Sequence, residues 1–575
     1  MKTILGFIHH THDAAATLLD GEKFLAAVEE ERINKDKHTN SFPGGAILEC
    51  LKIANINSKD ISHIAYPWNP WLRVIYGIYF TMKNFPSSMR VLARRGDGDF
   101  FQILNMEKTL ITFFKENNLS LNYEKFHFID HHTAHSAYGF YTSPFEKALI
   151  YTHDFCGEYH SIHMGIGEGN KIRNIAKIAY PNSLGFIFNA ITKYLGFLRN
   201  SDEGKVMGLA PYGDDRYIED FKKFVILKNN GTFQLDTSWF DIFFYDLKNG
   251  GESELVSKKF IKKFGAPRLI SEELNNHHRG IANALQHLLY HVNEHIINHF
   301  MRLYKLENLV VSGGVFLNSC ANGLILENSN VKNLHIPPAA GDAGTAKGAA
   351  LYVRNNILGN KKRVSSSPYM GSSYTDKNIE KKLKQENVNY KKVKDIVDTT
   401  TDLLIDGKVI GWFQGRMEFG PRALGSRSIL ADPRKYWMRD YINKEVKHRE
   451  LFRPLAPSMC LESFKDFFHG DPPSPYMLKV YKAKNNVLKQ IPAVLHVDNT
   501  ARVQTVSKTD NPLYHKLLEN FGQKTGIPIL LNTSFNDKGE PIVNTPEDSI
   551  KFFLNSKIDY LAIGNFLVSK ETHED

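Results

Sequence analysis

Residues 3–32 read TILGFIHHTHDAAATLLDGEKFLAAVEEER, and this stretch carries the pattern that decides the fold. Short apolar runs cover residues 3–8, 14–19 and 24–28, with Asp20-Gly21 between the second and the third. An Asp-Gly pair between two apolar runs is a strong β-hairpin signal. The stretch therefore predicts a short strand followed by a hairpin.

Later parts of the chain repeat the strand theme and alternate it with helices. Further strand-like runs lie at residues 148–152, 309–312 and 409–413. Residues 281–304 carry apolar side chains at steps of three or four, which is typical of an amphipathic helix. Strands that alternate with helices predict an α/β fold.

The length and composition predict a globular protein of at least two domains. The 575 residues are 42% hydrophobic and 23% charged, which leaves ample material for a core. Residues 359–373 are polar and Ser-rich and follow a helical pattern that ends near Asn356, so we expect a linker there. The predicted domains are residues 1–358 and 374–575.

Charge and cysteine content narrow the class only in part. The net charge of +10 favours anionic partners, but it also fits a lysine-rich solvated surface. None of the four cysteines shows the CxxC spacing of a redox or zinc motif. The N-terminal apolar run is too short for a signal peptide, and no stretch reaches the length of a membrane span, so we expect a soluble, cytoplasmic protein.

A histidine pair is the first candidate for site chemistry. His131 and His135 lie four residues apart, so they share one face if the segment is helical and could hold one divalent metal. Histidines at the start of a structural helix are the alternative. Asp154, after a strand-like run, and Asp342, in a Gly-rich turn, are acidic candidates to complete such a site. A second histidine series at residues 287, 291, 295 and 299 is interpreted as a half-exposed polar flank of its helix.

Two further segments point to phosphate groups. Gly313-Gly314 follows an apolar strand and precedes a helix, a turn at which backbone N–H groups can approach phosphate, although tight packing alone explains it as well. Residues 415–427 hold three arginines among glycines, which suits bidentate phosphate binding. A nucleic-acid surface is the competing interpretation, but it would more often mix basic runs with exposed aromatic residues.

These motifs together resemble a known family. The chain is similar to the O-carbamoyltransferases that include the nodulation-factor, tobramycin, novobiocin and cephem carbamoyltransferases. The resemblance runs along nearly all of the chain, and the ordered set of motifs is specific where each one alone is not. Its markers are residues 12–16, 29–32, 130–135 and 205–213, Gly313-Gly314 with Asn318, residues 341–344, and residues 415–434.

The resemblance implies an actin/Hsp70/sugar-kinase-like N-terminal domain and a YrdC-like α/β C-terminal domain. In such enzymes the C-terminal domain forms a carbamoyl-adenylate from carbamoyl phosphate and ATP. The N-terminal domain then transfers the carbamoyl group at a metal site to a hydroxyl of a small-molecule or glycan acceptor, as in natural-product biosynthesis. The implied cofactors are a divalent metal, Fe²⁺ first and Mn²⁺ or Zn²⁺ as alternatives, and Mg²⁺ with ATP. We expect no stable nucleic-acid partner, and a homodimer stays open.

The resemblance also implies roles for individual residues. His12 corresponds to the base of the transfer step. The remaining positions are metal ligands (His131, His135, Asp154, Asp342), carbamoyl-phosphate contacts (Lys447, Arg453, Arg502, Ser534) and nucleotide contacts (Gly313, Gly314, Asn318, Arg422, Asn532).

One position departs from the family pattern. The family usually has Asp-Gly-x-Gly-Glu where this chain has Asp154-Phe155-Cys156-Gly157-Glu158. Phe155 replaces a glycine, so either the turn differs or φ stays negative there. Cys156 could be a reactive thiol or a buried structural cysteine.

Three interpretations of function stay in view. Besides the O-carbamoyltransferase, these are a tRNA threonylcarbamoyladenosine-type enzyme and a non-catalytic actin-fold relative, against which the C-terminal cations argue. The acceptor cannot be read from the sequence. The aromatic stretch at residues 66–80, followed by Lys83, Arg90, Arg94 and Arg95, would suit a sugar or lipid-linked acceptor, or simply pack between helices. Residues 239–245 carry the same ambiguity.

Overall fold

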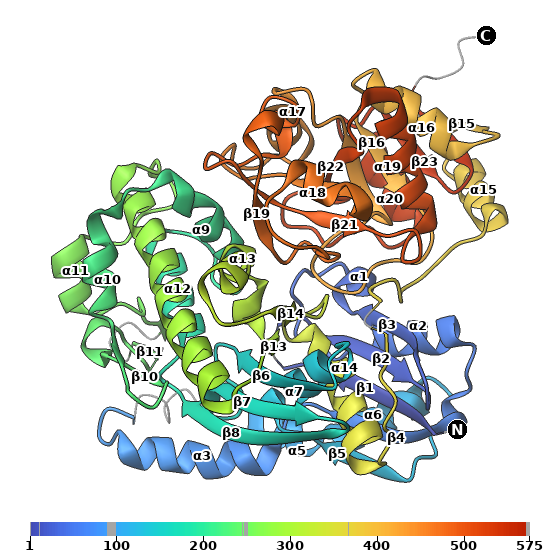
Figure 1. The fold of residues 1–575 in the computed structure, drawn as a ribbon. Helices are drawn as coiled ribbons and strands as arrows, with labels where there is room; N and C mark the ends of the chain where they lie inside the picture. The colour runs from blue at the N-terminus through green and yellow to red at the C-terminus, as the bar shows by residue number, and fades with distance from the viewer. Residues whose placement is uncertain are drawn as a thin grey trace. The chain divides into compact units, whose positions relative to one another are not determined.

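A computed structural model describes residues 2–10, 12–88, 99–243, 245–246, 251–365 and 367–570. The chain divides into two compact units, and each mixes helices with strands, which confirms the predicted α/β class (Figure 1). Residues 1–26 and 40–366 form the first unit, and residues 27–39 and 367–575 form the second. The later division falls inside the segment 359–373. The sequence did not predict that residues 27–39 belong to the second unit.

The first unit is built on two five-stranded sheets of the same topology. The first sheet has the order β3-β2-β1-β4-β5 and the second the order β8-β7-β6-β13-β14. In both, an antiparallel meander is extended by two parallel strands. This duplicated arrangement is the one expected for the actin/sugar-kinase fold. The strands are β1 (Thr3–Ile8), β2 (Ala15–Leu19), β3 (Phe24–Glu29), β4 (Ile61–Tyr66), β5 (Lys125–Phe128), β6 (Lys147–His153), β7 (His160–Glu168), β8 (Lys171–Ala179), β13 (Asn308–Ser312) and β14 (Asn333–His335).

Two helices lie between the sheets and carry most of the candidate metal ligands. Helix α14 packs on β1 and β2, helix α7 packs on β6 and β13, and the two helices pack on each other. Helix α12 extends the predicted segment 281–304 by five residues at its start and bears the four histidines on its partly exposed flank. The main helices of this unit are α2 (Gly44–Ala54), α3 (Pro70–Lys83), α6 (Met106–Glu116), α7 (His131–Tyr141), α8 (Leu184–Tyr194), α12 (Asn276–Tyr304), α13 (Ser319–Asn328) and α14 (Ala343–Tyr352).

The second unit is built on one eight-stranded mixed sheet with the order β15-β24-β23-β16-β17-β22-β18-β21. One apolar cluster joins α16 and α19 to the sheet, and a larger one includes α15, α20 and the loops after β18. The YrdC resemblance of this unit stays a prediction. Its elements include β15 (Asn389–Lys392), β16 (Ile410–Phe413), β17 (Arg427–Ala431), β18 (Ala456–Cys460), β21 (Gln504–Val506), β22 (Ile529–Ser534), β23 (Tyr560–Ile563), β24 (Phe566–Ser569), α1 (Glu31–Asn34), α15 (Asp376–Gln385), α16 (Ile396–Ile405), α17 (Met438–Tyr441), α19 (Pro512–Thr525) and α20 (Pro546–Leu554).

Two expectations about the whole chain can be compared with the structure. Within the described residues, no helix combines the length and the hydrophobicity of a transmembrane span. All four cysteines lie in described segments, and none forms a disulfide. Arg90, Arg94, Arg95 and Phe244, which belong to the two aromatic candidate segments, lie outside the described residues.

Candidate metal centre and anion-binding cluster

Helix α7 is oriented by its first residues. The Asp130 carboxylate accepts the backbone N–H of Thr133 at 2.8 Å, which caps the helix at its N-terminus. His131 and His135 then lie one turn apart on one face, as the spacing predicts. Both side chains are almost fully buried.

A glycine lets helix α14 approach α7 closely. A Cβ on Gly348 would lie 1.9 Å from the carbonyl oxygen of Ala134, so a larger residue there would push the helices apart. The close packing places Asp342, at the N-terminal end of α14, beside the histidines of α7. The ligand set thus depends on small residues at this helix crossing.

The end of β6 supplies the remaining carboxylate. Asp154 follows the strand, and its two oxygens accept the N–H groups of Phe155 at 2.7 Å and of Gly314 at 3.2 Å. Gly313 sits at φ +106°, and a Cβ there would lie 2.3 Å from the carbonyl oxygen of His153. The double-glycine turn therefore fixes Asp154.

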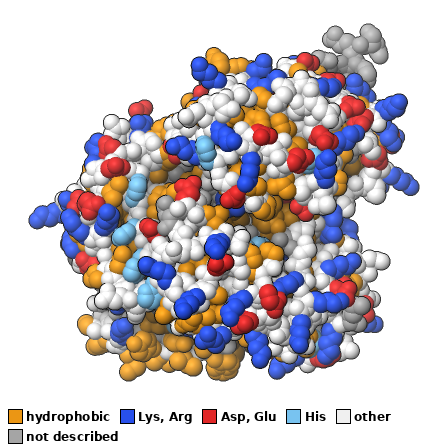
Figure 2. Space-filling model, in the orientation of Figure 1, with side chains coloured by type: hydrophobic (Ala, Val, Ile, Leu, Met, Phe, Trp, Pro, Cys, Tyr) orange, Lys and Arg blue, Asp and Glu red, His pale blue; other side chains and the backbone are white. Residues whose placement is uncertain are grey.

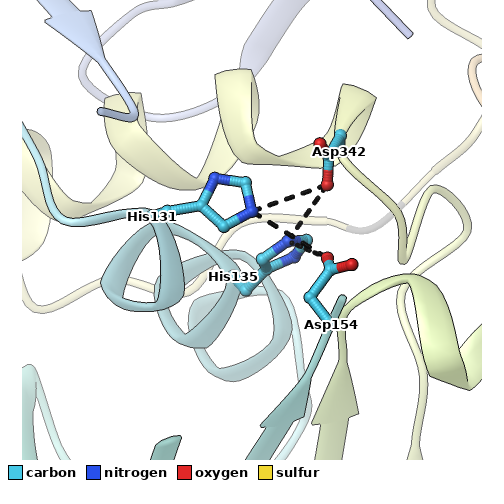
Figure 3. A group of neighbouring side chains, drawn as sticks. All are labelled: His131, His135, Asp154 and Asp342. Carbon is cyan, nitrogen blue, oxygen red and sulfur yellow. Dashed lines mark ion pairs between the residues drawn. The ribbon is translucent and has the colours of Figure 1, made fainter. Parts of the chain in front are cut away.

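His131, His135, Asp154 and Asp342 converge into one buried group (Figure 3). One ligand atom of each lies within 4.8 Å of all the others. His135 Nε2 lies 3.1 Å from an oxygen of Asp154 and 3.7 Å from one of Asp342. His131 Nε2 lies 3.5 Å from that same Asp342 oxygen and 3.9 Å from Asp154. Two imidazole nitrogens and two carboxylates form a mixed N/O donor set.

The hydrogen bonding of His135 fits a metal ligand. The Ser312 hydroxyl donates to the carbonyl oxygen of Ala340 at 3.3 Å, so its oxygen accepts a hydrogen bond from His135 Nδ1–H, 3.2 Å away. The lone pair of a neutral His135 is then on Nε2, which faces the carboxylate oxygens of Asp154 and Asp342. Second-shell contacts of this kind fix the tautomer of metal-bound histidines.

The pKa values follow from the same arrangement. Burial raises the pKa of Asp342, as does the charge of Asp154, but the neighbouring imidazoles outweigh both and hold it at about 2. The pKa of Asp154 lies well below its usual value because His131 and His135 overcome the effect of burial. Burial lowers the pKa of His131, but the two carboxylates raise it well above its ordinary value. The pocket therefore favours two ionised carboxylates and compensating positive charge.

Phe155, which stands where the family usually has glycine, does not need a left-handed backbone conformation. Phe155 is not among the residues with positive φ, which is the second of the two predicted alternatives. Its ring stacks on Tyr180, with the centroids 6.1 Å apart, and meets the edge of Phe186. Burial raises the pKa of the neighbouring Cys156 thiol to about 12, which favours the structural role over the reactive one.

His12, the predicted base, is held by its neighbour. Its Nδ1 lies 2.9 Å from a carboxylate oxygen of Asp13, and its side chain is 36% exposed. Desolvation lowers the pKa of His12, but the charges of Asp13, Asp342 and Asp154 raise it to about 10. Asp13 makes the largest of these contributions, and the candidate metal ligands Asp342 and Asp154 add to it, so the pKa of His12 depends on its neighbour and on the candidate ligands together.

The predicted nucleotide contacts of this unit have structural partners. The Gly314 N–H holds Asp154. The Asn318 side chain caps α13 through Ala321 and exchanges two hydrogen bonds with the amide of Gln286. Their assignment to a nucleotide stays a prediction.

In the second unit, Lys447 is almost fully buried at the end of β22. Its ammonium donates to the Ser534 carbonyl at 2.7 Å, to the Ser534 hydroxyl at 3.3 Å, and to both oxygens of Asn536. Burial lowers the pKa of Lys447 well below its usual value, and the charges of Arg449, Lys37 and Arg453 lower it further. The predicted pair of Lys447 and Ser534 is therefore in direct contact.

Four arginines gather around Lys447 and act on one another's charge. Burial lowers the pKa of Arg422 well below its usual value, and Arg502 and Arg453 lower it further. Burial, then Arg453 and Arg502, lower the pKa of Arg449 to about 9. Two acidic neighbours moderate this repulsion: Glu450, 3.8 Å from Arg453, raises the pKa of Arg449, and Asp537 raises the pKa of Lys447. Lys447, Arg422, Arg449, Arg453 and Arg502 are called the anion cluster below.

Asn532 lies within strand β22, two residues before Ser534. It is 1% exposed, and its amide donates to Ser458, Gln504 and the carbonyl of Ala423. Its side-chain oxygen has no hydrogen-bond partner in the described part of the chain. Asn532 is thus a buried amide whose hydrogen bonds go to protein groups, and its predicted contact with a nucleotide stays a prediction.

Four residues that contact these sites were not predicted as site residues. Arg449 stands two positions after Lys447, so its sequence neighbourhood could have revealed it, and Asn536 stands two positions after Ser534. Glu158 accepts the N–H of His131, and the Trp68 ring lies 4.7 Å from the His131 ring. Glu158 ends the motif at residues 154–158 and Trp68 lies in the aromatic stretch 66–80, but neither pattern indicates a contact with His131.

Comparison with known proteins decides the family. The family model "Carbamoyltransferase N-terminus" matches residues 3–351, and "Carbamoyltransferase C-terminus" matches residues 401–570. The chain belongs to the carbamoyltransferase family. It is 34% identical to nodulation protein NolNO of Sinorhizobium fredii, across 98% of this chain and 79% of that protein. It is also 37% identical to an uncharacterized protein of Synechocystis sp., across 99% of this chain and 97% of that one.

A relative whose name states its activity matches a shorter part of the chain. The 3'-hydroxymethylcephem-O-carbamoyltransferase of Amycolatopsis lactamdurans is 34% identical over 258 residues, which is 45% of this chain and 48% of that enzyme. The recognition made from the motifs is therefore confirmed at the level of the family. The acceptor of this family member is a separate question.

Proposed function

We propose that this carbamoyltransferase forms a carbamoyl-adenylate from carbamoyl phosphate and ATP and passes the carbamoyl group to a hydroxyl of a small-molecule or glycan acceptor. The observation that carries the proposal is the anion cluster. Its five cations are buried or half-buried, and Arg453 and Arg502 lower the pKa of both Arg422 and Arg449, so negative charge that enters the site would stabilise their charged forms. Carbamoyl phosphate and the triphosphate of ATP supply such charge.

The chemistry of adenylate formation suits these side chains. Water first releases carbamate and inorganic phosphate from carbamoyl phosphate. The carbamate oxygen then attacks the α-phosphate of ATP, pyrophosphate leaves as the adenylate forms, and the negative charge that develops on the phosphate oxygens needs fixed donors. Arg422, Arg453 and Arg502 offer planar guanidinium groups that bind phosphate through two hydrogen bonds. Lys447 offers a compact charge positioned by Ser534 and Asn536.

The transfer step is assigned to the first unit. His131, His135, Asp154 and Asp342 would hold a divalent metal, which would polarise the carbamoyl carbonyl or orient the phosphate when bound. The attacking hydroxyl must lose its proton, and His12 is the candidate acceptor. At a pKa of about 10 His12 would already be protonated, so it can act as a base only when the charges of Asp13, Asp342 and Asp154 that raise its pKa are compensated. AMP leaves as the carbamoyl ester forms.

The test is carbamoyl-phosphate-dependent formation of AMP and pyrophosphate by the purified full-length protein with Mg²⁺ and Fe²⁺. We expect Lys447→Met to lower the rate by about 10²–10³-fold, the range for losing one preorganised electrostatic contact. Lys570→Met is the matched control, because Lys570 packs over Phe553 elsewhere in the same unit. It should keep the wild-type rate.

Two results would contradict the proposal. The first is a folded, metal-loaded wild type that makes neither AMP nor pyrophosphate from carbamoyl phosphate and ATP. The second is a Lys447→Met variant as active as Lys570→Met. Acceptor identity would follow from a screen of sugar and aminoglycoside hydroxyls, scored by carbamoylated product.

A further inference from the structure

Helix α3 carries a large apolar face that points to solvent. Figure 2 shows hydrophobic side chains gathered along the lower edge of the molecule, over this helix. The exposed side chains recur at steps of three or four and so form one stripe. Their exposed fractions lie between 52% and 74%, for Trp71, Ile75, Ile78, Tyr79, Met82 and Phe85. Monomeric soluble proteins rarely expose so many large apolar groups together.

The opposite face of α3 is already packed. The Tyr76 ring stacks on Tyr159, with the centroids 4.9 Å apart and the planes at 10°. The Phe80 ring lies 5.9 Å from Tyr180. The helix is therefore anchored by one set of aromatic side chains and presents another set outward.

The surroundings of this face are basic. Residues 69–88 contain Arg73 and Lys83 but neither aspartate nor glutamate. The neighbouring edge strand β8 adds exposed Lys171, Arg173 and Lys177, again without an acidic residue. The charge of Lys177 acts on His160, whose ring meets Tyr76 edge to face at 5.1 Å. Cations thus reach the rim of the apolar stripe.

We propose that α3 is a docking surface for an anionic lipid bilayer. Interfacial helices combine a Trp- and aliphatic-rich face with flanking lysines and arginines, and both features are present here. A second copy of this chain fits less well, because a symmetric pairing through α3 would bring two basic rims together.

Docking would act on the candidate metal centre through two contacts. Asn69 caps α3 through Trp71 and Leu72, and its own N–H donates to Glu158 at 2.8 Å. The same carboxylate accepts the N–H of His131. A bilayer that holds α3 would therefore hold the first turn of α7 at a fixed depth below the lipid surface.

Cosedimentation of the full-length protein with phosphatidylcholine vesicles, with and without phosphatidylglycerol, tests the proposal. We expect binding to the anionic vesicles that weakens with salt. Ile75→Glu/Ile78→Glu should lower the partition coefficient about tenfold or more, from the apolar area lost. Ile226→Glu, at a residue 58% exposed on β9 (Val225–Leu227), is the matched control and should bind as wild type does. Lys83→Ser/Lys177→Ser should lower it about fivefold for each charge.

A second measurement needs no destabilising change. Brominated lipids should quench the emission of Trp71 in the wild type, and Trp71→Phe should remove that quenched component. Failure of the wild type to bind anionic vesicles, or equal binding by wild type and Ile75→Glu/Ile78→Glu, would overturn the proposal. So would a wild type that sediments as a dimer which only the α3 variant dissociates, because the face would then be a self-association surface.

Discussion

Replacing Ser312 by alanine should weaken metal binding although Ser312 is not a ligand in the candidate site. Its hydroxyl oxygen accepts a hydrogen bond from His135 Nδ1–H at 3.2 Å. This leaves the Nε2 lone pair for the metal. Loss of a neutral hydrogen bond costs about 0.5–1.5 kcal/mol. The second imidazole tautomer, with its proton on Nε2, then becomes accessible. Because a metal binds only the other tautomer, this adds roughly 0.4 kcal/mol to the loss of binding free energy. The sum of about 1–2 kcal/mol corresponds to a five- to thirty-fold weaker Kd, near the lower end of measured second-shell effects.

The assay is titration of chelator-stripped protein with Mn²⁺, with the unbound ion counted by electron paramagnetic resonance, and then with Fe²⁺ under argon. Ser143→Ala is the matched control. Ser143 is equally buried, and its hydroxyl donates to the Phe140 carbonyl at 2.8 Å, at the end of α7 away from the cluster. Both variants should lose similar stability, but only Ser312→Ala should lose affinity. A Kd within twofold of wild type for Ser312→Ala, at equal stoichiometry, would refute the tautomer argument.

Two further predictions concern stability. Gly313→Ala should destabilise the protein by about 2–4 kcal/mol, because alanine is strained at φ +106° and its Cβ would meet the His153 carbonyl. Urea unfolding measures it against Gly341→Ala, whose Cβ meets only Leu317 at an ordinary 3.4 Å, and equal loss in both would contradict the explanation. Burial, then His63 and Lys125, lower the pKa of His127 from 6.5 to about 4, so the unfolded chain binds the extra proton and stability falls as pH drops from 6.5 towards 4. His127→Phe should flatten that decline in urea midpoints, and an unchanged slope would exclude His127 as its source.

Local patterns predicted what depends on neighbours in sequence. The hairpin around Asp20-Gly21 forms because a turn signal and two apolar runs act within a few residues, and β2 and β3 lie where expected. His131 and His135 share a face for the same reason, once Asp130 starts the helix. Both predictions need only the period of a strand or a helix.

Long-range contacts explain what the sequence could not provide. The sequence presented Gly313-Gly314 as a possible nucleotide turn, but it gave no sign that the Gly314 N–H also holds Asp154, 160 residues earlier in the chain. Ser312 matters only because β13 pairs with β6 and places its hydroxyl beside His135. No local pattern encodes either partner, because each depends on how the second sheet closes.

The motif at residues 29–32 shows how the N-terminal segment serves the second unit. Arg32 is almost fully buried, pairs with Glu29 at 2.8 Å, and donates to the carbonyl of Gly420 at 3.0 Å. The N–H of Gly420 in turn donates to Glu29 at 3.3 Å. Gly420 lies two residues before Arg422 of the anion cluster, so these bonds brace the backbone that leads to a proposed phosphate contact. A fragment starting at residue 367 would leave that backbone without its partners. The fold of the second unit therefore depends on the segment 27–39, and the proposed adenylate formation should be lost in a fragment that lacks this segment.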